Sequence, residues 1–430
     1  MSGIAILHDR LQLDGMDVVN IAERFGTPAY VYGGDSICDG VRSLKRALSD
    51  SVDVYYSMKA NPSIAICRLI HQSGVNGAEI ASSGELVSAI YSGFEPEHIL
   101  YAGPGKTDAE LKHAIKVGVG QINAESEGEI QRINRVASKA GVVQSVGIRV
   151  NFESDAAGQG LIQTSGGTQK FGIDESRVVD AIGVINLLEH VRFAGFHTML
   201  GSQVLDADRM LQSCERSLEM ALAIAESQGI EIPTMNFGGG LGVPHAGDDQ
   251  SFDLGLFGSK LSSIIERAKE QQAFMHTRFM IEPGRILVSE HGLYLSRVIE
   301  VKESCGRRVA IVDGGIHHAL LPITANHYRV CIADRAGEQQ TGQVMLGGPL
   351  CTSADQWVPQ VELPHISVGD TVAMFNSGAY GLTASMTMFL SHETPAEVLI
   401  LDGECTKIRQ RSEPDDVLRG QHIPDSINHP

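Results

Sequence analysis

The chain has 430 residues, of which 43% are apolar and 20% are charged, and its 34 basic and 52 acidic side chains give a net charge of −18. This composition is typical of a folded, water-soluble protein with enough chain for two domains. A strong excess of negative charge repels phosphate backbones and anionic lipids. It therefore argues against a nucleic acid or a membrane surface as the main partner.

The seven cysteines are widely spaced and include no C-x-x-C pair. This pattern argues against a disulfide framework or a zinc site and is typical of a reducing compartment. The first residues, MSGIAILHDRLQLDG, carry charge too early for a signal peptide, and no apolar run reaches the ~20 residues of a membrane span. We therefore predict a cytoplasmic protein with no bound metal.

From about residue 50, short apolar runs alternate with segments of helical period. The candidate strands are 52–60, 78–82, 99–103, 121–125, 145–151, 192–200, 234–240 and 278–285, and helical patterns such as 62–74, 85–93 and 207–229 lie between them. Eight such alternations over ~230 residues predict a (β/α)8 barrel. An open doubly wound sheet is the competing architecture, and the absence of G-x-G-x-x-G after the first strand weakens it.

The pattern changes after about Arg285, where strand-like segments are separated by turns instead of long helices. These segments are 286–304, 307–315, 342–350, 370–380 and 396–404. We predict a barrel over 31–285, a β-sandwich or β-barrel domain built from 1–30 together with 286–415, and a flexible polar tail over 416–430. Within 1–30 we expect one short strand of its own, and GTPAYVYGGDSI leads from it into the barrel.

Polar residues fall where the barrel strands end, which is the face that carries the active site of such barrels. Lys59 ends the first strand in YYSMKAN. A lysine desolvated at a barrel mouth has a lowered pKa and offers a free amine for Schiff-base chemistry. The structural alternative is a lysine that extends its ammonium group to water from a strand end.

Three glycines, Gly238, Gly239 and Gly240, end the seventh strand in NFGGGLGVPH. Glycines let several backbone N–H groups approach one anion, and the late strands of a barrel are the usual place for a phosphate. Ser202, after the sixth strand, can add a hydroxyl to this cradle. The structural alternative is a tight loop that requires positive φ.

Glu282 ends the eighth strand in IEPGR, close to Arg285. It is either one member of a structural charge pair or the partner of a pyridinium nitrogen, which needs a carboxylate to keep it protonated. A lysine, a phosphate cradle and a carboxylate at one barrel face together meet the requirements of pyridoxal 5′-phosphate (PLP).

Seven motifs in this order extend the pattern: YYSMKANPS, GAEIASSGE, FHTMLGSQ, NFGGGLGVPH, IEPGR, GGPLCTSAD and NSGAYG. Over roughly residues 25–410 the chain resembles the fold-type III PLP-dependent decarboxylases, the family of the diaminopimelate and ornithine decarboxylases. The resemblance implies a PLP-binding barrel followed by a β domain. It also implies a homodimer in which the partner's β domain completes each active site.

The resemblance also implies roles for individual residues. Lys59 matches the lysine that bonds covalently to the cofactor, and Cys351 matches a catalytic acid that protonates Cα after carbon dioxide has left. The cofactor contacts that it implies are Lys59, Glu79, Arg149, Met199, Ser202, Gly238, Gly239, Gly240, Glu282, Arg285 and Tyr380. The substrate contacts that it implies are Arg285, His317, His318, Asp355 and Tyr380. Two other cysteines, Cys67 and Cys214, lie on helical patterns and are interpreted as buried, inert thiols.

Three departures from the familiar members bear on the substrate. Met199 stands where those enzymes carry a histidine stacked on the PLP ring, and His197, two residues earlier, has either a catalytic or a structural role. Leu321 stands where diaminopimelate decarboxylases carry an arginine for the distal carboxylate, so that carboxylate would lack a bidentate partner. The ornithine-type run D-G-x-Y-G-S-F is also missing, and His317 and His318 take its place.

The DGG-x-HH, GGPLCT and NSGAYGLTAS segments resemble more closely a smaller branch. It includes the decarboxylase of carrier-protein-tethered glutamate in butirosin biosynthesis and decarboxylases of siderophore pathways. We therefore predict a specialised biosynthetic decarboxylase that acts on an amino acid attached to a carrier protein or to a small-molecule conjugate. Because carrier proteins are usually acidic, the charge of −18 leaves the two kinds of attachment equally open.

Other functions remain as alternatives. The first is a diaminopimelate decarboxylase that makes L-lysine. A PLP racemase is a lesser alternative, against which Glu282 and Cys351 argue. A non-catalytic regulatory homologue is another, and the presence of both Lys59 and Cys351 argues against it.

Overall fold

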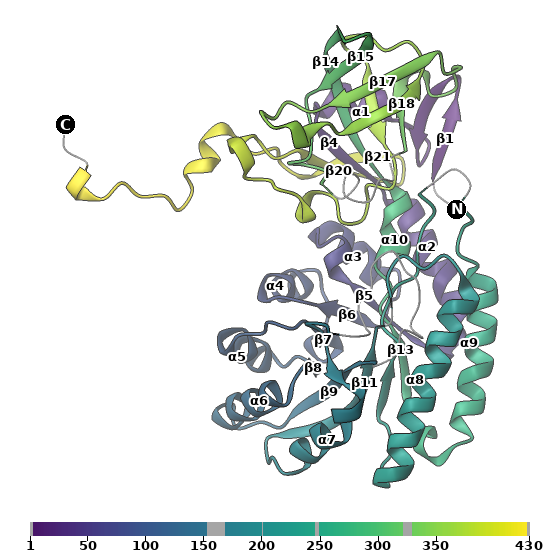
Figure 1. The fold of residues 1–430 in the computed structure, drawn as a ribbon, viewed down its shortest axis with the longest axis vertical. Helices are drawn as coiled ribbons and strands as arrows, with labels where there is room; N and C mark the ends of the chain where they lie inside the picture. The colour runs from purple at the N-terminus through teal and green to yellow at the C-terminus, as the bar shows by residue number, and fades with distance from the viewer. Residues whose placement is uncertain (1–2, 153–167, 200, 246–248, 321–328, 428–430) are drawn as a thin grey trace. The chain divides into compact units, whose positions relative to one another are not determined.

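The structure is a computed structural model that describes residues 3–152, 168–199, 201–245, 249–320 and 329–427 (Figure 1). The chain divides into two compact units. One spans Ser36–Ser289, and the other combines Ser2–Asp35 with Glu290–Pro430. We refer to them as the barrel unit and the β unit.

The barrel unit contains a closed ring of parallel strands. Its strands are β5 (Asp53–Ser57), β6 (Gly77–Ile80), β7 (Ile99–Tyr101), β8 (Gln121–Ala124), β9 (Gln144–Asn151), β11 (Val191–Thr198), β12 (Thr234–Asn236) and β13 (Arg278–Ile281). They pair in the order β9-β11-β12-β13-β5-β6-β7-β8, and β8 pairs back with β9. The two-residue strand β10 (Ile173–Asp174) pairs with β9 in addition. The closure confirms the predicted (β/α)8 barrel and excludes the open doubly wound sheet.

Helices follow the barrel strands and surround them (Figure 1). They are α2 (Gly34–Leu48), α3 (Ile64–Gln72), α4 (Ser83–Tyr91), α5 (Asp108–Val117), α6 (Glu127–Ala140), α7 (Val178–Asn186), α8 (Ala207–Gln228) and α9 (Leu254–Lys269). Local sequence fixes several ends. The Thr107 hydroxyl and Glu110 form a capping box at the start of α5, and Asp206 accepts two backbone N–H groups at the start of α8. Gly229 ends α8 in the left-handed conformation.

The β unit is built around a nine-stranded sheet. Its strands are β4 (Ala29–Gly33), β14 (Gly292–Ser304), β15 (Arg307–Val312), β16 (Val330–Ile332), β17 (Gly342–Gly347), β18 (Val358–Leu363), β19 (Thr371–Met374), β20 (Ala396–Leu401) and β21 (Glu404–Arg409). They run in the order β18-β17-β15-β14-β4-β20-β21, while β19 pairs with β14 and β16 pairs with β19. A predominantly β second domain is thus confirmed.

The N-terminal segment of the β unit is richer than the single strand that we expected. It forms a small sheet of β1 (Ile4–Leu7), β2 (Arg10–Leu13) and β3 (Met16–Asp17), followed by helix α1 (Val18–Phe25). Leu11, Leu13 and Val18 pack in one apolar cluster with residues of β4, β14 and β20. The first residues of the chain are therefore part of the core of the unit that also contains its last strands.

One expected strand start is wrong. The run ILVSEH, predicted as the beginning of a strand, forms the short helix α10 (Arg285–Val288) and a 3-10 turn, Ser289–His291, before β14 begins. Leu287 and Val288 are buried in this helix. A short apolar run satisfies the burial requirement of either structure, so its pattern does not distinguish them.

The C-terminal segment contains two further 3-10 turns, Pro414–Leu418 and Asp425–Ile427. The predicted flexibility of 416–430 stays a prediction. Throughout the described ranges, no helix combines the length and the apolar character that a membrane crossing requires.

Candidate active site

Lys59 lies immediately after β5, in a single 3-10 turn, Met58–Ala60. Its Nζ is 3.1 Å and 3.3 Å from the two carboxylate oxygens of Glu79, which lies on the neighbouring strand β6. The Ser57 hydroxyl donates a hydrogen bond of 2.5 Å to the same carboxylate. Glu79 is buried, whereas the Lys59 side chain is 45% exposed. The structure thus presents an accessible amine that is oriented by a buried acid.

Glu282 follows β13 and is 4% exposed. The Asn236 side-chain amide donates a 2.6 Å hydrogen bond to Oε1, and Nε2 of His197 lies 3.1 Å from Oε2. Burial alone would raise the pKa of the Glu282 carboxyl. The nearby His197 ring, the charge of Lys59 and the Asn236 amide outweigh burial and hold this pKa well below its usual range. Glu282 is therefore ionised at neutral pH.

Three neighbouring strands of the barrel, β9, β11 and β12, each contribute one polar side chain at the same level. His197 is in register with Arg149 of β9 on one side and with Asn236 of β12 on the other. In register, side chains of parallel strands point to the same face of the sheet. Thr198 points the opposite way, because its hydroxyl lies 3.0 Å from Ser217 of the surrounding helix α8. The row of Arg149, His197 and Asn236 therefore points into the barrel.

The glycine loop after β12 lies against the loop after β11. The backbone N–H of Val204 donates to the Gly240 carbonyl at 2.9 Å. A Cβ at Gly239 would lie 2.3 Å from the Glu282 carbonyl oxygen, and one at Gly240 would lie 2.4 Å from that of Gly201. Gly238 has φ of +69°. Only glycines fit this loop, whose backbone comes close to its neighbours, as a phosphate cradle requires.

Two further predicted residues border this cradle. The Met199 sulfur would be 2.9 Å from a Cβ at Gly238, so Met199 packs directly on the glycine loop. Ser202 is half-buried in the facing loop, and Arg285 is half-buried at the first position of α10. These residues surround the barrel end at which Lys59 and Glu282 also lie.

Arg149 is engaged by an acid that the sequence had not singled out. Its Nη1 lies 3.1 Å from Oε1 of Glu125, and its guanidinium lies 4.5 Å from the centre of the Phe171 ring. Glu125 also accepts backbone N–H groups from Gly103 at 3.1 Å and from Gly172 at 2.7 Å. Arg149 is thus part of a structured charge cluster at the barrel mouth.

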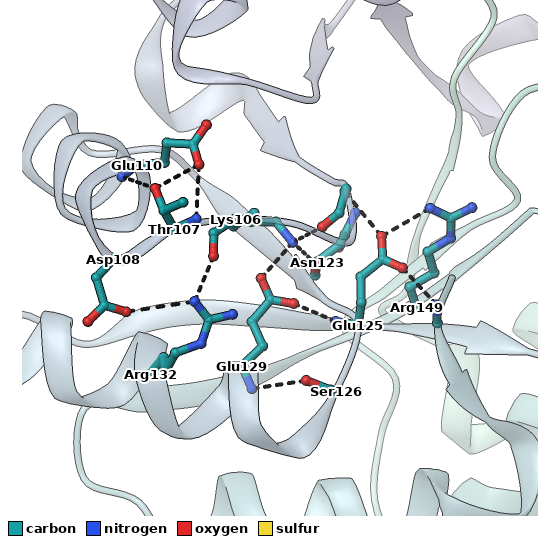
Figure 2. A network of polar contacts seen from close by, with 12 residues as sticks. Lys106, Thr107, Asp108, Glu110, Asn123, Glu125, Ser126, Glu129, Arg132 and Arg149 are labelled. Carbon is teal, nitrogen blue, oxygen red and sulfur yellow. Dashed lines mark hydrogen bonds and ion pairs between the residues drawn. The ribbon is translucent and has the colours of Figure 1, made fainter. Parts of the chain in front are cut away.

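A buried lysine extends this cluster (Figure 2). Nζ of Lys106 lies 2.8 Å from Oε1 of Glu129 and donates to the carbonyls of Gly103, at 2.6 Å, and Asn123, at 2.8 Å. The other Glu129 oxygen accepts the backbone N–H of Glu125 at 2.8 Å, which links the Lys106 pair to the Arg149 pair. Burial lowers the pKa of Lys106, and the adjacent Glu129 opposes that shift.

The β unit contains the other predicted site residues. Cys351 is exposed in the loop after β17. Asp355, a few residues later, is 4% exposed and accepts the backbone N–H groups of Ile316 at 2.8 Å and Leu350 at 2.9 Å. Asp355 therefore ties the loop after β15 to the loop of Cys351. Burial raises the pKa of the Asp355 carboxyl, and the two backbone N–H groups oppose that shift.

Two adjacent histidines lie in the loop after β15. Nδ1 of His318 is 3.0 Å from the Tyr294 hydroxyl, and its Nε2 is 2.7 Å from the Glu393 carbonyl oxygen. The His317 ring lies against that of His318 at a tilt of 43°, with 3.7 Å between ring centres, and its ring nitrogens have no hydrogen-bond partner within the described part of the chain. Burial lowers the pKa of His317 to about 4 and that of His318 to about 3, so both rings are neutral at pH 7.

Tyr380 lies after β19, half-buried and with a positive φ of 52°. Leu321, the position at which the arginine was expected, lies outside the described residues. No group of three or more histidine, cysteine or acidic side chains is placed to hold a metal ion within the ranges that the structure describes.

The predicted residues thus fall into two sets, one in each unit. The barrel unit brings together, at the strand ends, Lys59, Glu79, Met199, Ser202, Gly238–Gly240, Glu282 and Arg285. Arg149 lies in the same unit, in register with His197. The β unit contains His317, His318, Cys351, Asp355 and Tyr380. Sequence reasoning missed Asn236, Ser57, Glu125 and Lys106. Asn236 had a usable signal, since it is a polar residue at the end of an apolar strand, directly before the glycine loop.

The barrel unit fits PLP on its own geometry. The cofactor needs an amine for its aldehyde, an acid at its ring nitrogen and a cradle for its phosphate. Lys59 offers an accessible amine, Glu282 is a buried carboxylate kept ionised, and side chains are sterically excluded from the glycine loop.

Comparisons with known proteins agree with this fit. Residues 35–289 match the family model described as pyridoxal-dependent decarboxylase, pyridoxal binding domain. The chain is 34% identical over 419 residues to the L-glutamyl-[BtrI acyl-carrier protein] decarboxylase of Niallia circulans, covering 96% of this chain and 97% of that protein. It is 31% identical over 424 residues to the diaminopimelate decarboxylase of Methanothermobacter thermautotrophicus, covering 96% of each.

Solved structures show the same architecture. The diaminopimelate decarboxylase of M. jannaschii in complex with L-lysine superposes with a TM-score of 0.90 at 27% identity, covering 99% of this chain and 100% of that one. The Helicobacter pylori enzyme, also with L-lysine, gives a TM-score of 0.84 at 25% identity, covering 94% and 98%. With its closed barrel, its β unit and these relatives, the chain belongs to the pyridoxal-dependent decarboxylases and is a PLP-dependent carboxy-lyase.

Proposed function

We propose that the enzyme removes the α-carboxylate of an amino acid whose distal end is attached to a larger group, in a specialised biosynthetic pathway. The observation that carries this proposal is the pair of buried histidines in the β unit. Burial holds the pKa of both rings well below neutrality, so neither ring presents a positive charge to a free distal carboxylate. A distal amide, ester or thioester carries no charge and does not require one.

The relatives support two substrates. The protein from Niallia circulans acts on glutamate tethered to an acyl-carrier protein, and the protein from Methanothermobacter thermautotrophicus acts on diaminopimelate. The two relatives are 34% and 31% identical to this chain, which is a small difference. Diaminopimelate decarboxylation is therefore the second candidate function. The histidine pair favours the tethered substrate.

The chemistry divides among the residues as follows. Bound PLP supplies an electron-withdrawing ring that takes up the electrons left when carbon dioxide departs. Lys59 provides the amine that holds the cofactor, and Glu79 orients it. Glu282 would hold a proton on the ring nitrogen, and the backbone of Gly238–Gly240 would hold the phosphate. Cys351 delivers a proton to the substrate Cα.

We further propose that the enzyme is a homodimer in which Cys351 of one subunit serves Lys59 of the other. Two inactive variants, Lys59→Ala and Cys351→Ala, test this when they are mixed, dissociated and reassociated. Random pairing makes half of the dimers hybrid, each with one intact site, so about a quarter of the wild-type activity should return. No recovery, with hybrid dimers verified by mass, would mean that both residues act within one subunit.

A substrate panel tests the proposed activity. Carbon dioxide release is measured with free diaminopimelate, lysine, ornithine and glutamate. It is compared with release from glutamate joined to pantetheine through a γ-thioester, and from a citrate–lysine amide. We expect kcat/KM for one conjugate to exceed that for every free amino acid by at least about a hundredfold. Lys59→Ala controls for uncatalysed release.

The panel also separates the candidates. Rapid turnover of free diaminopimelate, with a kcat/KM above that of both conjugates, would establish the second candidate. Conversion of an L-amino acid to its D-form without carbon dioxide would instead indicate a racemase.

A further inference from the structure

His197 contacts Glu282 inside the barrel. Its Nε2 lies 3.1 Å from Oε2 of Glu282, and its side chain is 2% exposed. The distance is that of an ion pair, but the angle departs from that of a hydrogen bond, and Nδ1 has no partner within the described residues. Glu282 is therefore the polar contact that the described residues give to the His197 ring.

The register of the barrel strands explains how this contact forms. His197 is in register with Asn236, and both point into the barrel, where the two side chains reach opposite oxygens of the Glu282 carboxylate. With one oxygen approached by an amide and the other by an imidazole, the carboxylate cannot rotate without losing both contacts.

A buried carboxylate needs such support to remain charged. Without compensation, burial shifts an acid toward its neutral form. Asn236 supplies one neutral hydrogen bond, and the ammonium of Lys59 acts from a distance. The His197 imidazole, in contact with Oε2, is the largest of the causes that hold the Glu282 pKa down against burial.

We propose that His197 is a positioning residue: it fixes the orientation of the Glu282 carboxylate and keeps it ionised, and so sets the proton affinity of the cofactor's ring nitrogen. This inference rests on the assignment of Glu282 to that nitrogen. His197 acts through Glu282 and does not touch the reacting atoms.

The test uses the intact enzyme loaded with PLP that carries ¹⁵N in the ring, because the nitrogen chemical shift reports protonation directly. In the wild type we expect a protonated ring nitrogen from pH 6 to 9. In His197→Phe the carboxylate loses its polar neighbour at Oε2, and the apparent pKa of the ring nitrogen should fall by at least about one unit. In His197→Gln, which retains a neutral donor, a smaller fall is expected.

Two controls separate positioning from packing. Thr198→Val changes the adjacent buried residue, which points to the opposite face of the same strand, and should leave the nitrogen shift unchanged. Glu282→Gln alone and Glu282→Gln combined with His197→Phe should give the same nitrogen titration, because His197 acts only through Glu282. We also expect kcat to fall about tenfold in His197→Phe, with little change in KM.

The outcomes distinguish this inference from the function on which it rests. An unchanged nitrogen titration in both His197→Phe and His197→Gln, with PLP bound, would overturn the role of His197. If His197→Phe fails to fold, His197→Gln alone decides. If the wild-type ring nitrogen is unprotonated throughout, the assignment of Glu282 falls as well.

Discussion

Near the predicted site residues, buried polar groups have different partners in the two units. In the barrel unit such groups are paired with opposite charges, as in Lys106 with Glu129 and Arg149 with Glu125. In the loops of the β unit that carry the predicted site residues, they are kept neutral or bound to backbone, as in His317 and Asp355. A charged cofactor requires the first environment. An uncharged distal group on the substrate suits the second.

The largest expected effect tests the charged half of this comparison. Lys59→Ala removes the amine beside Glu79 and should lower kcat/KM by roughly a thousandfold or more. The visible absorbance of lysine-bound PLP should disappear. Lys112→Ala, which removes an exposed lysine on α5, is the matched control and should leave both unchanged. Full activity in Lys59→Ala would contradict the site.

The next largest effect is expected when one partner of the buried Lys106–Glu129 pair is removed. Glu129→Gln leaves the Lys106 ammonium, whose side chain is 1% exposed, without its carboxylate. The free energy of unfolding should fall by about 3–5 kcal/mol, because an unpaired buried charge is strongly destabilising. Denaturant titration followed by circular dichroism at the helical signal measures this, since the barrel unit contains the long helices.

Two further variants sharpen that result. Lys106→Met combined with Glu129→Leu should recover most of the stability, since neither charge then remains buried. Asp108→Ala breaks an exposed pair with Arg135, in which both side chains are about half exposed, and should cost far less stability than Glu129→Gln. Equal losses for the buried and the exposed pair would remove the contrast between them.

The neutral histidines predict how acid destabilises the β unit. The pKa of His317 is about 4 and that of His318 about 3, against an ordinary 6.5. Between pH 6.5 and 4 the unfolded chain therefore binds protons that the folded chain does not, and stability falls as the pH falls. For His317 the loss continues down to about pH 4, and for His318 down to about pH 3.

The fluorescence of Trp357, the chain's single tryptophan, can follow the unfolding of the β unit at each pH, because this residue is fully buried there. In His317→Gln the slope of unfolding free energy against pH, between pH 6.5 and 5, should be smaller than in the wild type, because a group that takes up a proton only on unfolding has been removed. Identical slopes in the variant and the wild type would show that His317 is protonated in the folded protein.

The smallest effect concerns Asp355. Asp355→Asn retains one acceptor oxygen, but an amide NH2 then faces one of the two backbone N–H groups. We expect a loss of about 1–3 kcal/mol in the β unit, followed again by Trp357 fluorescence. Asp415→Asn, at an exposed position, should be neutral. A neutral Asp355→Asn would mean that the two loops are held together by other contacts.

The sequence predicted the barrel because the alternation of short apolar strands with helical periods is strong and repeated. It did not predict the starts of elements where a short apolar run fits two structures, as at Ile286. It also missed the strands β16, β18 and β21, because β16 has only three residues and the other two mix apolar with polar residues. Helix and strand periods describe local burial. They do not say which strands pair.

The candidate site shows the same limit. Lys59, Glu282 and the glycine loop were visible because the chemistry requires those residue types at strand ends. The contact of His197 with Glu282 was not predictable, since it depends on the register of β11 against β12 and on the reach of two side chains. The Lys106 network was also missed, because a lysine in a polar loop carries no sign that the fold buries it.

Strand β4 joins the N-terminal and C-terminal parts of the β unit, and this arrangement affects the order in which the unit can form during synthesis. β4, near the N-terminus, lies between β14 and β20 in the sheet of the β unit. A ribosome completes β4 on the order of tens of seconds before it reaches β20. During synthesis the barrel unit emerges whole, while β4 has an unpaired edge until the last strands are made. The sheet of the β unit thus forms fully only after β20 and β21 have been made, and a chain that stops before them leaves β4 without its partner on that side.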